Sequence, residues 1–228
     1  MFTHCHDHRE KFIEMKRLYE DEVRYYKVDE ETNLSYPSIT SILSFNNRDK
    51  FADWRQRVGN EEANRITKHS TDRGTKFHKV CEGYLQNGDY ESLDEYQVPL
   101  VQLMFKAAKP HIDKRINNIH LQEAGMHSTK LCLAGTVDLI AEMDGELAVI
   151  AFKTAKEEKP IEWLEDYFVQ LFAYWAMFTE HTQVLPRKLV VFLVGENGDV
   201  QIEVSKPLPI HYDTLKDYVS KFIRSRDA

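Results

Sequence analysis

The spacing of apolar positions divides this chain of 228 residues into a helical first half and a strand-rich second half. Between residues 46 and 118, apolar side chains recur every three or four positions, which is the period of a helix with one buried face. We expect these helices over residues 49–58, 61–68, 72–86 and 98–108. The last should stop before Pro110, because proline lacks the backbone N–H and clashes with the preceding turn.

Short β-branched and aromatic runs bounded by turn residues predict strands. Val23–Val28 and the segment after the DEETN turn predict a hairpin, and Pro37-Ser38 predicts the start of a short helix. Further strands are expected over residues 119–126, 131–143, 146–155, 188–194 and 200–204, and helices over 163–178 and 212–225. This order predicts an α/β fold with a mixed central β-sheet flanked by helices, and with a helical elaboration at the N-terminus.

Neither an internal repeat nor a linker rich in proline or glycine interrupts the chain. We therefore expect a single domain over residues 1–228, with a hairpin and helical part at 1–118 and a sheet-based core at 119–228. The 42% of hydrophobic residues suffice for a large core, which excludes disorder throughout. No apolar run approaches the roughly 18 residues of a membrane span, and the sequence does not begin with a signal-peptide pattern. These features predict a soluble, intracellular, cytoplasmic protein with no membrane partner.

Cysteine and charge content exclude several classes of protein. The three cysteines are far apart and form no CxxC pair, which argues against a disulfide framework, a zinc ribbon or a four-cysteine iron–sulfur cluster. The net charge of −7 disfavours a surface that binds nucleic acid everywhere. Residues 46–80 nevertheless hold nine basic and five acidic residues, interleaved with aromatic side chains. This segment is predicted to be either a local nucleic-acid surface or an ordinary solvated helix face.

Two charged residues stand in strands that are otherwise apolar. Asp138 is flanked by valine, leucine and isoleucine, and Lys153 lies near the end of the next strand. If Asp144-Gly145 forms a two-residue type I′ turn, Asp138 lies opposite Ala151, and Asp138, Ala151 and Lys153 share one face of the sheet. Such charges are either a structural ion pair near a strand end or part of an active site.

The sequence around these residues resembles a known nuclease family. GTVDLIAEMDGELAVIAFKTAK, which contains both charges, resembles the core of the PD-(D/E)XK nuclease superfamily. RGTKFHKVCE at 73–82 and QLFAY at 170–174 resemble the GTxxHxxxE and QxxxY motifs of its RecB-like exonucleases. YPSITSIL and DKFADWR resemble the branch that contains the mitochondrial genome maintenance exonuclease and related phage exonucleases. The resemblance covers roughly residues 23–194 and implies a restriction-endonuclease-like core.

The resemblance implies a site for one or two divalent ions, Mg²⁺ or Mn²⁺, that hydrolyses phosphodiester bonds. It makes Asp138 a metal ligand, position 151 the second acidic ligand, and the carbonyl oxygen of Phe152 a third. His78 becomes a further ligand, and Lys153 becomes the catalytic lysine that orients water or offsets negative charge. Histidine is more comfortable with Mn²⁺ than with Mg²⁺, so manganese is expected to support activity well.

The same resemblance gives roles to residues outside the central strands. Gln170 is expected to bond a nucleotide near the cleaved phosphate, and Tyr174, four residues later, to support the site or stack on a base. Arg73 and Lys76 are expected to bind DNA. Glu82 is expected to support the site from the turn after His78, and the alternative for His78 is a helix-face histidine that only bonds Glu82 and holds no metal.

One position departs from the family pattern, because IAFKTA stands where the family has an aspartate in place of the first alanine. The methyl group of Ala151 cannot coordinate a hard cation, which needs oxygen ligands. We therefore interpret the chain as a catalytically disabled nuclease. An introduced Asp-to-Ala substitution explains the otherwise complete motif better than natural degeneration does.

Three functions remain open from the sequence. The first is a single-stranded DNA exonuclease of phage or organellar DNA metabolism, present as an inactive variant, whose helical part at 1–118 encloses the strand. The second is a natural pseudo-nuclease that binds DNA as an accessory of replication or recombination proteins. The third is a protein-interaction domain that keeps the fold without the site; salt-dependent DNA affinity would exclude it.

Overall fold

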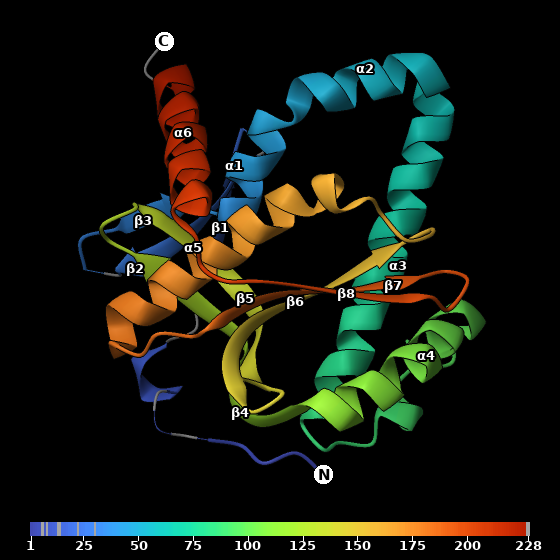
Figure 1. Ribbon diagram of the computed structural model, residues 1–228. Helices are drawn as coiled ribbons and strands as arrows, with labels where there is room; N and C mark the ends of the chain where they lie inside the picture. The colour runs from blue at the N-terminus through green and yellow to red at the C-terminus, as the bar shows by residue number, and fades with distance from the viewer. Residues whose placement is uncertain (6, 8, 13–14, 22, 30, 227–228) are drawn as a thin grey trace.

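Two β-sheets organise the protein (Figure 1). The computed structural model describes every residue except 6, 8, 13, 14, 22, 30, 227 and 228. The larger sheet has the order β4-β5-β6-β7-β8, with strands at Ile116–Ser128, Leu133–Met143, Glu146–Ala155, Lys188–Gly195 and Val200–Ser205. β6 and β7 run parallel and the other neighbours antiparallel, which confirms the predicted mixed sheet.

Helices lie on both faces of this sheet. The described helices are α1 (Ile39–Asn46), α2 (Arg48–Val58), which stands away from the sheet, α3 (Asn60–Leu85), α4 (Pro99–Arg115), α5 (Glu165–Thr182) and α6 (Pro209–Arg226), with short 3₁₀ helices at Arg9–Lys11, Tyr90–Ser92 and Ile161–Leu164. α5 packs on one face with α1 and α6 behind it, and α3 and α4 pack on the other face. Alternate residues of β6 therefore enter two cores: Val149 and Ala151 pack on the α5 side, and Ile150 and Phe152 on the α3 side. None of the described helices is both long and apolar enough to cross a membrane.

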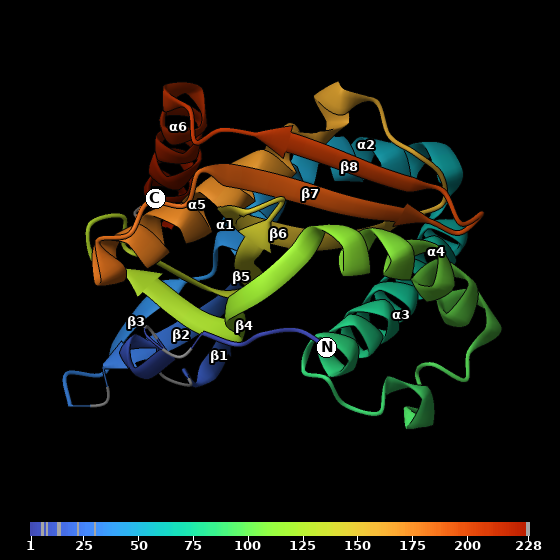
Figure 2. The same ribbon diagram turned by 60° about the horizontal axis from the view of Figure 1, so that its bottom comes forward.

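A smaller antiparallel sheet lies beside β5 and consists of β1 (Arg17–Glu20), β2 (Val23–Asp29) and β3 (Leu34–Pro37) (Figure 2). The predicted hairpin of β2 and β3 is confirmed, as is the short helix after it. Ser38 caps that helix by accepting the backbone N–H of Ser41 at 3.0 Å. Sequence analysis missed β1, because this short and mostly exposed strand lacks an apolar alternation.

The hairpin between β5 and β6 has the predicted register. Asp144 and Gly145 have positive φ angles of 53° and 76°, as a type I′ turn requires. The pairing of Leu139 with Ile150 follows from that two-residue turn. The turn therefore sets which residues of β5 and β6 meet at the far end of the hairpin.

Two helix predictions need correction. α3 is one helix of 26 residues where two were expected, because the polar stretch at 61–71 contains neither proline nor glycine to end it. α4 continues through Pro110 instead of stopping before it. Lys106, whose carbonyl loses its helical partner, is exposed to water, while Ile112 stays fully buried and anchors the last turn.

α2 differs from the other helices because none of its residues is buried. It begins directly after Asn47 and ends at Gly59, whose φ of 86° turns the chain into α3. In Figure 1, α1, α2 and the start of α3 form an arch over α5. The side chains of α2 are therefore accessible to another molecule.

Candidate active site

Asp138 lies where β5 and β6 separate. The backbone ladder between these strands ends at Leu139 and Ile150, and Oδ2 of Asp138 accepts the backbone N–H of Phe152 at 2.9 Å. The carboxylate thus satisfies a backbone donor that the next ladder bond would otherwise have used. Its side chain is 14% exposed, so it is fixed by the strands yet still accessible from the side of α3.

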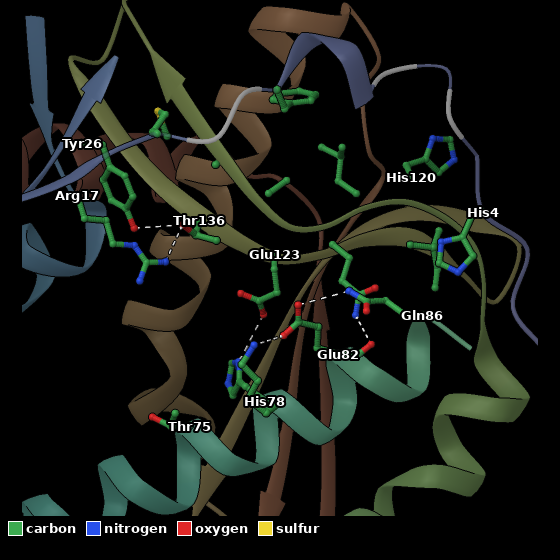
Figure 3. Close-up of a pocket in the computed structure, with 18 of the residues that line it drawn as sticks. His4, Arg17, Tyr26, Thr75, His78, Glu82, Gln86, His120, Glu123 and Thr136 are labelled. Atoms are coloured by element: carbon green, nitrogen blue, oxygen red, sulfur yellow. Dashed lines mark hydrogen bonds and ion pairs between the residues drawn. The ribbon is translucent and has the colours of Figure 1, made fainter. Parts of the chain in front are cut away.

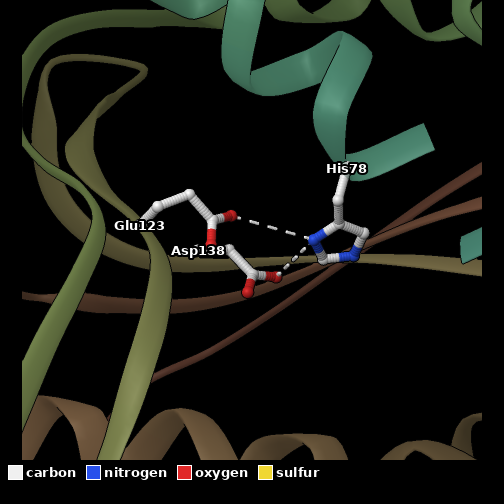
Figure 4. A group of neighbouring side chains, drawn as sticks. All are labelled: His78, Glu123 and Asp138. Carbon is white, nitrogen blue, oxygen red and sulfur yellow. Dashed lines mark ion pairs between the residues drawn. The ribbon is translucent and has the colours of Figure 1, made fainter. Parts of the chain in front are cut away.

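His78 reaches the same point from α3. Its Nε2 lies 2.8 Å from the carbonyl oxygen of Phe152. A carbonyl oxygen only accepts hydrogen bonds, so this bond requires the proton on Nε2 and turns Nδ1 to the opposite side. Nδ1 lies 3.8 Å from Oδ2 of Asp138 and 3.9 Å from Oε1 of Glu123 (Figure 4).

Glu123 is a residue of this site that sequence analysis missed. It lies in β4 opposite Asp138, between two regular pairs of the β4–β5 ladder. Its φ of 45° falls in the left-handed region, which residues other than glycine rarely adopt in a strand. A glutamate in an alternating strand usually faces solvent, so only the register opposite Asp138 could have identified it.

The two carboxylates set the preferred charge at the histidine. Burial alone would lower the pKa of His78, but Asp138 and Glu123 outweigh burial and raise that pKa above its ordinary value. Lys153 acts in the opposite sense, which places its charge close to the same group. The surroundings of Nδ1 therefore favour a positive charge, carried either by a proton or by a metal ion.

The donor atoms of His78, Glu123 and Asp138 fit a divalent cation. One ligand atom from each residue lies within 4.8 Å of the others. In an octahedral Mg²⁺ site with bonds of about 2.1 Å, neighbouring donors are about 3.0 Å apart and opposite donors about 4.2 Å, so small side-chain movements suffice. Carboxylate oxygens suit Mg²⁺ and Mn²⁺, and the imidazole nitrogen favours Mn²⁺.

Lys153 is held in place by α5. Its Nζ donates to Oε1 of Gln170 at 3.1 Å and lies 5.1 Å from the ring centroid of Tyr167. Gln170 donates in turn from Nε2 to the hydroxyl of Tyr174 at 3.3 Å. Gln170 is 6% and Tyr174 2% exposed, so Tyr174 cannot stack on a base. The structure brings the three predicted residues together, with Gln170 and Tyr174 as supports of the lysine.

Ala151 offers no ligand to this site. Its side chain is 1% exposed and packs in the core on the α5 side, the side to which Lys153 also turns. Asp138 faces α3 instead, so the expectation that these three residues share one face is wrong for Asp138. The reason is a break in the strand's alternation, because Val137 and Leu139 on either side of Asp138 pack into different cores.

Arg73 has a structural role that contradicts its predicted contact with DNA. Its side chain is 6% exposed and forms an ion pair with Glu196, and its Nε donates to Oγ1 of Thr154 at 3.1 Å. The guanidinium therefore ties α3 to the end of β6 and to the turn after β7. A guanidinium held in this way is not available to a phosphate.

Lys76 and Glu82 also lie on α3, and each forms an ion pair within the helix. Lys76 pairs with Asp72 at 2.6 Å, on a face where both side chains are partly exposed, so the lysine remains available to a phosphate. Glu82 pairs with Lys79 at 2.9 Å, whereas His78 bonds the carbonyl of β6. The predicted contact of Glu82 with the histidine is therefore wrong, because the nearer lysine competes for it.

A cavity of about 1520 Å³ opens onto His78 and Glu123 (Figure 3). It lies between α3, β4 and the smaller sheet, and its basic lining residues are Lys16, Arg17, Arg24 and Lys79. Sequence analysis placed the basic surface at 46–80 and missed the three cations before residue 25. They lie far from His78 and Glu123 in the sequence, and only the folding of the smaller sheet onto β5 brings them to the cavity.

Comparisons with known proteins agree with this geometry. The family profile described as PD-(D/E)XK nuclease superfamily matches residues 52–225, which include His78, Glu123, Asp138 and Lys153. The human protein "Mitochondrial genome maintenance exonuclease 1" is 27% identical over 155 residues. That alignment covers 64% of this chain and 44% of the human protein, so the chain spans less than half the length of this relative.

Proposed function

Because this chain belongs to the PD-(D/E)XK nuclease superfamily, we propose that it is a divalent-metal-dependent exonuclease that hydrolyses single-stranded DNA from its ends. The observation that carries this proposal is that His78 and Asp138 meet where β5 and β6 part, with the charge of Lys153 near enough to act on the pKa of the histidine. Two of these side chains are metal donors, and the third is a nearby cation. This is the set of charges that phosphodiester hydrolysis with a metal ion requires.

The chain's own groups divide the work of hydrolysis. When bound, Mg²⁺ or Mn²⁺ activates water and stabilises negative charge on the phosphate. Asp138 supplies a carboxylate whose direction is fixed by the N–H of Phe152. His78 supplies a nitrogen whose direction is fixed by the carbonyl of the same residue. Lys153 keeps a positive charge beside them, in a position to offset charge that develops at the phosphate.

The arch and the basic cavity support a single-stranded substrate. α2 has no buried residue and forms the top of the arch over α5, which leaves its basic and aromatic side chains free to contact a strand. The cavity next to Glu123 adds cations from α3 and from the smaller sheet. We propose that these surfaces together enclose the strand, which then has to enter by its end. The human relative is itself named as an exonuclease.

Ala151 limits the rate that we propose for this chain. With no carboxylate at position 151, we expect cleavage to be slow while DNA binding is retained. A natural pseudo-nuclease that binds DNA without cutting it is the second candidate, and the same alanine supports it. The two candidates differ in whether the remaining residues can catalyse the reaction once a carboxylate is restored.

The test restores that carboxylate with Ala151→Asp and measures nucleotide release from end-labelled linear single strands in Mg²⁺ and in Mn²⁺. We expect the metal-dependent rate to rise at least about a hundredfold, because the acidic residue of the family motif is restored two positions before Lys153. Adding Lys153→Ala should remove the gain, and chelation of the metal should abolish it. Position 151 is buried, so the unfolding temperature of each variant is measured alongside. An unchanged rate in both metals contradicts the nuclease and favours the pseudo-nuclease.

A further inference from the structure

We infer that Glu123 is a metal ligand in this chain, and that it supplies from β4 the carboxylate that Ala151 cannot supply from β6. The cation would lie between Nδ1 of His78 and the carboxylates of Glu123 and Asp138 (Figure 4). The inference rests on the proposed function, because it concerns the same ion. It adds that the chain binds this ion without any carboxylate at position 151.

The order of the strands makes such a substitution possible. β5 lies between β4 and β6, and the register places Glu123 on one side of Asp138 and Ala151 on the other. Neighbouring strands are about 4.8 Å apart, so a carboxylate on either side starts from a similar distance to Asp138. A ligand lost from β6 can therefore be supplied from β4.

The side-chain directions favour β4. Glu123 and Asp138 both point at His78, and their nearest oxygens lie 3.9 and 3.8 Å from its Nδ1. These distances are those of loose ion pairs and exceed the length of a hydrogen bond, which leaves space for an ion between the groups. Because Nε2 carries the proton that Phe152 accepts, Nδ1 presents a lone pair to two negative groups. A positive charge among the three, a metal ion or a proton on Nδ1, turns this repulsion into attraction.

The backbone at Glu123 adds an independent observation. Its positive φ is a rarely occupied conformation for a glutamate, and such conformations persist where the surrounding structure fixes them and cluster at functional sites. Glu123 also lines the cavity together with His78, so an ion and a strand can reach it from solvent (Figure 3).

Glu82 provides a matched comparison within the same cavity. It is the same residue type, lies on the helix that carries His78, and has a side chain 24% exposed, against 35% for Glu123. Its carboxylate is paired with Lys79 at 2.9 Å and is not a member of the donor cluster. Glu82→Gln therefore removes one negative charge from the cavity without removing a ligand.

Binding of Mn²⁺ alone tests the inference without DNA. Electron paramagnetic resonance distinguishes free from bound Mn²⁺ in the unaltered chain, in Glu123→Gln and in Glu82→Gln. We expect the unaltered chain to bind Mn²⁺, Glu123→Gln to weaken the affinity at least about tenfold, and Glu82→Gln to change it less than about twofold. Glu123→Asp keeps the charge and should recover part of the lost affinity. Thermal unfolding without metal checks that each variant is folded.

Three results would overturn the inference: an unaltered chain that binds no Mn²⁺, a Glu123→Gln variant that binds as well as the unaltered chain, or equal losses in the two glutamine variants. Retained binding in Glu123→Gln would mean that this glutamate only orients His78. Failure of the proposed function looks different, because Ala151→Asp would then bind Mn²⁺ and release no nucleotides. The two outcomes are therefore distinguishable.

Discussion

Lys153 donates a hydrogen bond from Nζ to Oε1 of Gln170, 3.1 Å away. Gln170 is buried, so its amide serves the lysine and does not present a surface to a nucleotide. The lysine itself comes from β6 and the glutamine from α5, so this bond fixes the cation relative to both layers of the fold. Gln170 is thus a positioning residue whose loss should affect turnover more than DNA binding.

Gln170→Ala, made together with Ala151→Asp, should lower the turnover rate about tenfold and leave the affinity for single-stranded DNA within about twofold. The freed lysine would spend less time beside the phosphate, whereas the surfaces that hold the strand are unchanged. Gln102→Ala on the outer side of α4 is the control and should change neither quantity. A loss of affinity at unchanged turnover would instead show that Gln170 contacts the DNA.

Gly135 is required by the packing of Tyr174. A Cβ at position 135 would lie 2.7 Å from Cε1 of Tyr174, too close for any side chain. Gly135→Ala should therefore lower the free energy of unfolding by about 1 to 3 kcal/mol, as overpacking of a filled core does. Urea denaturation measures the change.

The control for that substitution is Gly74→Ala in α3, where the nearest atom to a Cβ is 3.6 Å away, an ordinary contact. Alanine is the better helix former, so this variant should gain about 0.5 to 1 kcal/mol. If Gly135→Ala proves as stable as Gly74→Ala, Tyr174 does not occupy the described position.

The ion pair of Arg73 with Glu196 should contribute to stability and not to DNA binding. Arg73→Ala should lower the free energy of unfolding by about 2 to 3 kcal/mol, because it leaves Glu196 without its buried partner. Lys76→Ala, on a more exposed face of the same helix, should change the free energy of unfolding by less than about 0.5 kcal/mol. It should reduce the slope of log affinity for DNA against log salt concentration by the amount expected for about one phosphate contact. The opposite pattern would restore Arg73 as a DNA contact.

The same ion pair gives stability a defined pH dependence. Partial burial alone would raise the pKa of Glu196, but hydrogen bonds from His69 and Arg73 outweigh it and lower the pKa. A carboxylate with a lowered pKa in the folded state stabilises the fold above its ordinary pKa, and this stability is lost as the pH falls through the lowered value. In Glu196→Gln, the free energy of unfolding should therefore fall less steeply as the pH is lowered. Urea denaturation at a series of acidic pH values measures this, and an unchanged pH dependence would contradict the role of this pair.

Much of the sheet could be predicted from the sequence, because its determinants are local. Asp144-Gly145 fixes the turn and hence the register of β5 with β6. The sequence predicts two helices in place of α3, because the polar segment in its first half resembles a loop. Only the structure shows that this segment is helical and buries few residues. Pro110 was treated as a stop because the sequence does not show that the unpaired carbonyl faces water.

The site was predictable only in part, because some of its residues come together only in the folded chain. Asp138 and Lys153 are conspicuous because charges are costly in apolar strands, and His78 followed from the resemblance. Glu123 depended on a strand register and on an unusual φ, neither of which composition reveals. Arg73 was misassigned because its partner lies 123 residues away, and only the fold brings the two together.

The proposed enclosure of the strand predicts a requirement for strand ends. Ala151→Asp should degrade a linear single strand and leave a covalently closed circle of the same sequence intact, since a circle has no end with which to enter an enclosed site. An open groove would not discriminate in this way, because contacts with phosphates are indifferent to ends. The matched control is the same circle opened by a single cut. Equal cleavage of the closed and opened forms would show that no enclosure operates and that the enzyme is an endonuclease.

The most direct measurement is the single-turnover rate of nucleotide release by Ala151→Asp with and without Asp138→Asn. Asp138 accepts a hydrogen bond from the backbone of β6 and lies beside His78. In the proposed mechanism the reacting phosphate lies next to this carboxylate. We predict a loss of at least about a hundredfold in Mg²⁺ and in Mn²⁺, with affinity for single-stranded DNA changed by less than about threefold. If the double variant with Asp138→Asn releases nucleotides within about threefold of the rate of Ala151→Asp alone, the proposed active site is contradicted, because cleavage would then occur elsewhere in the protein.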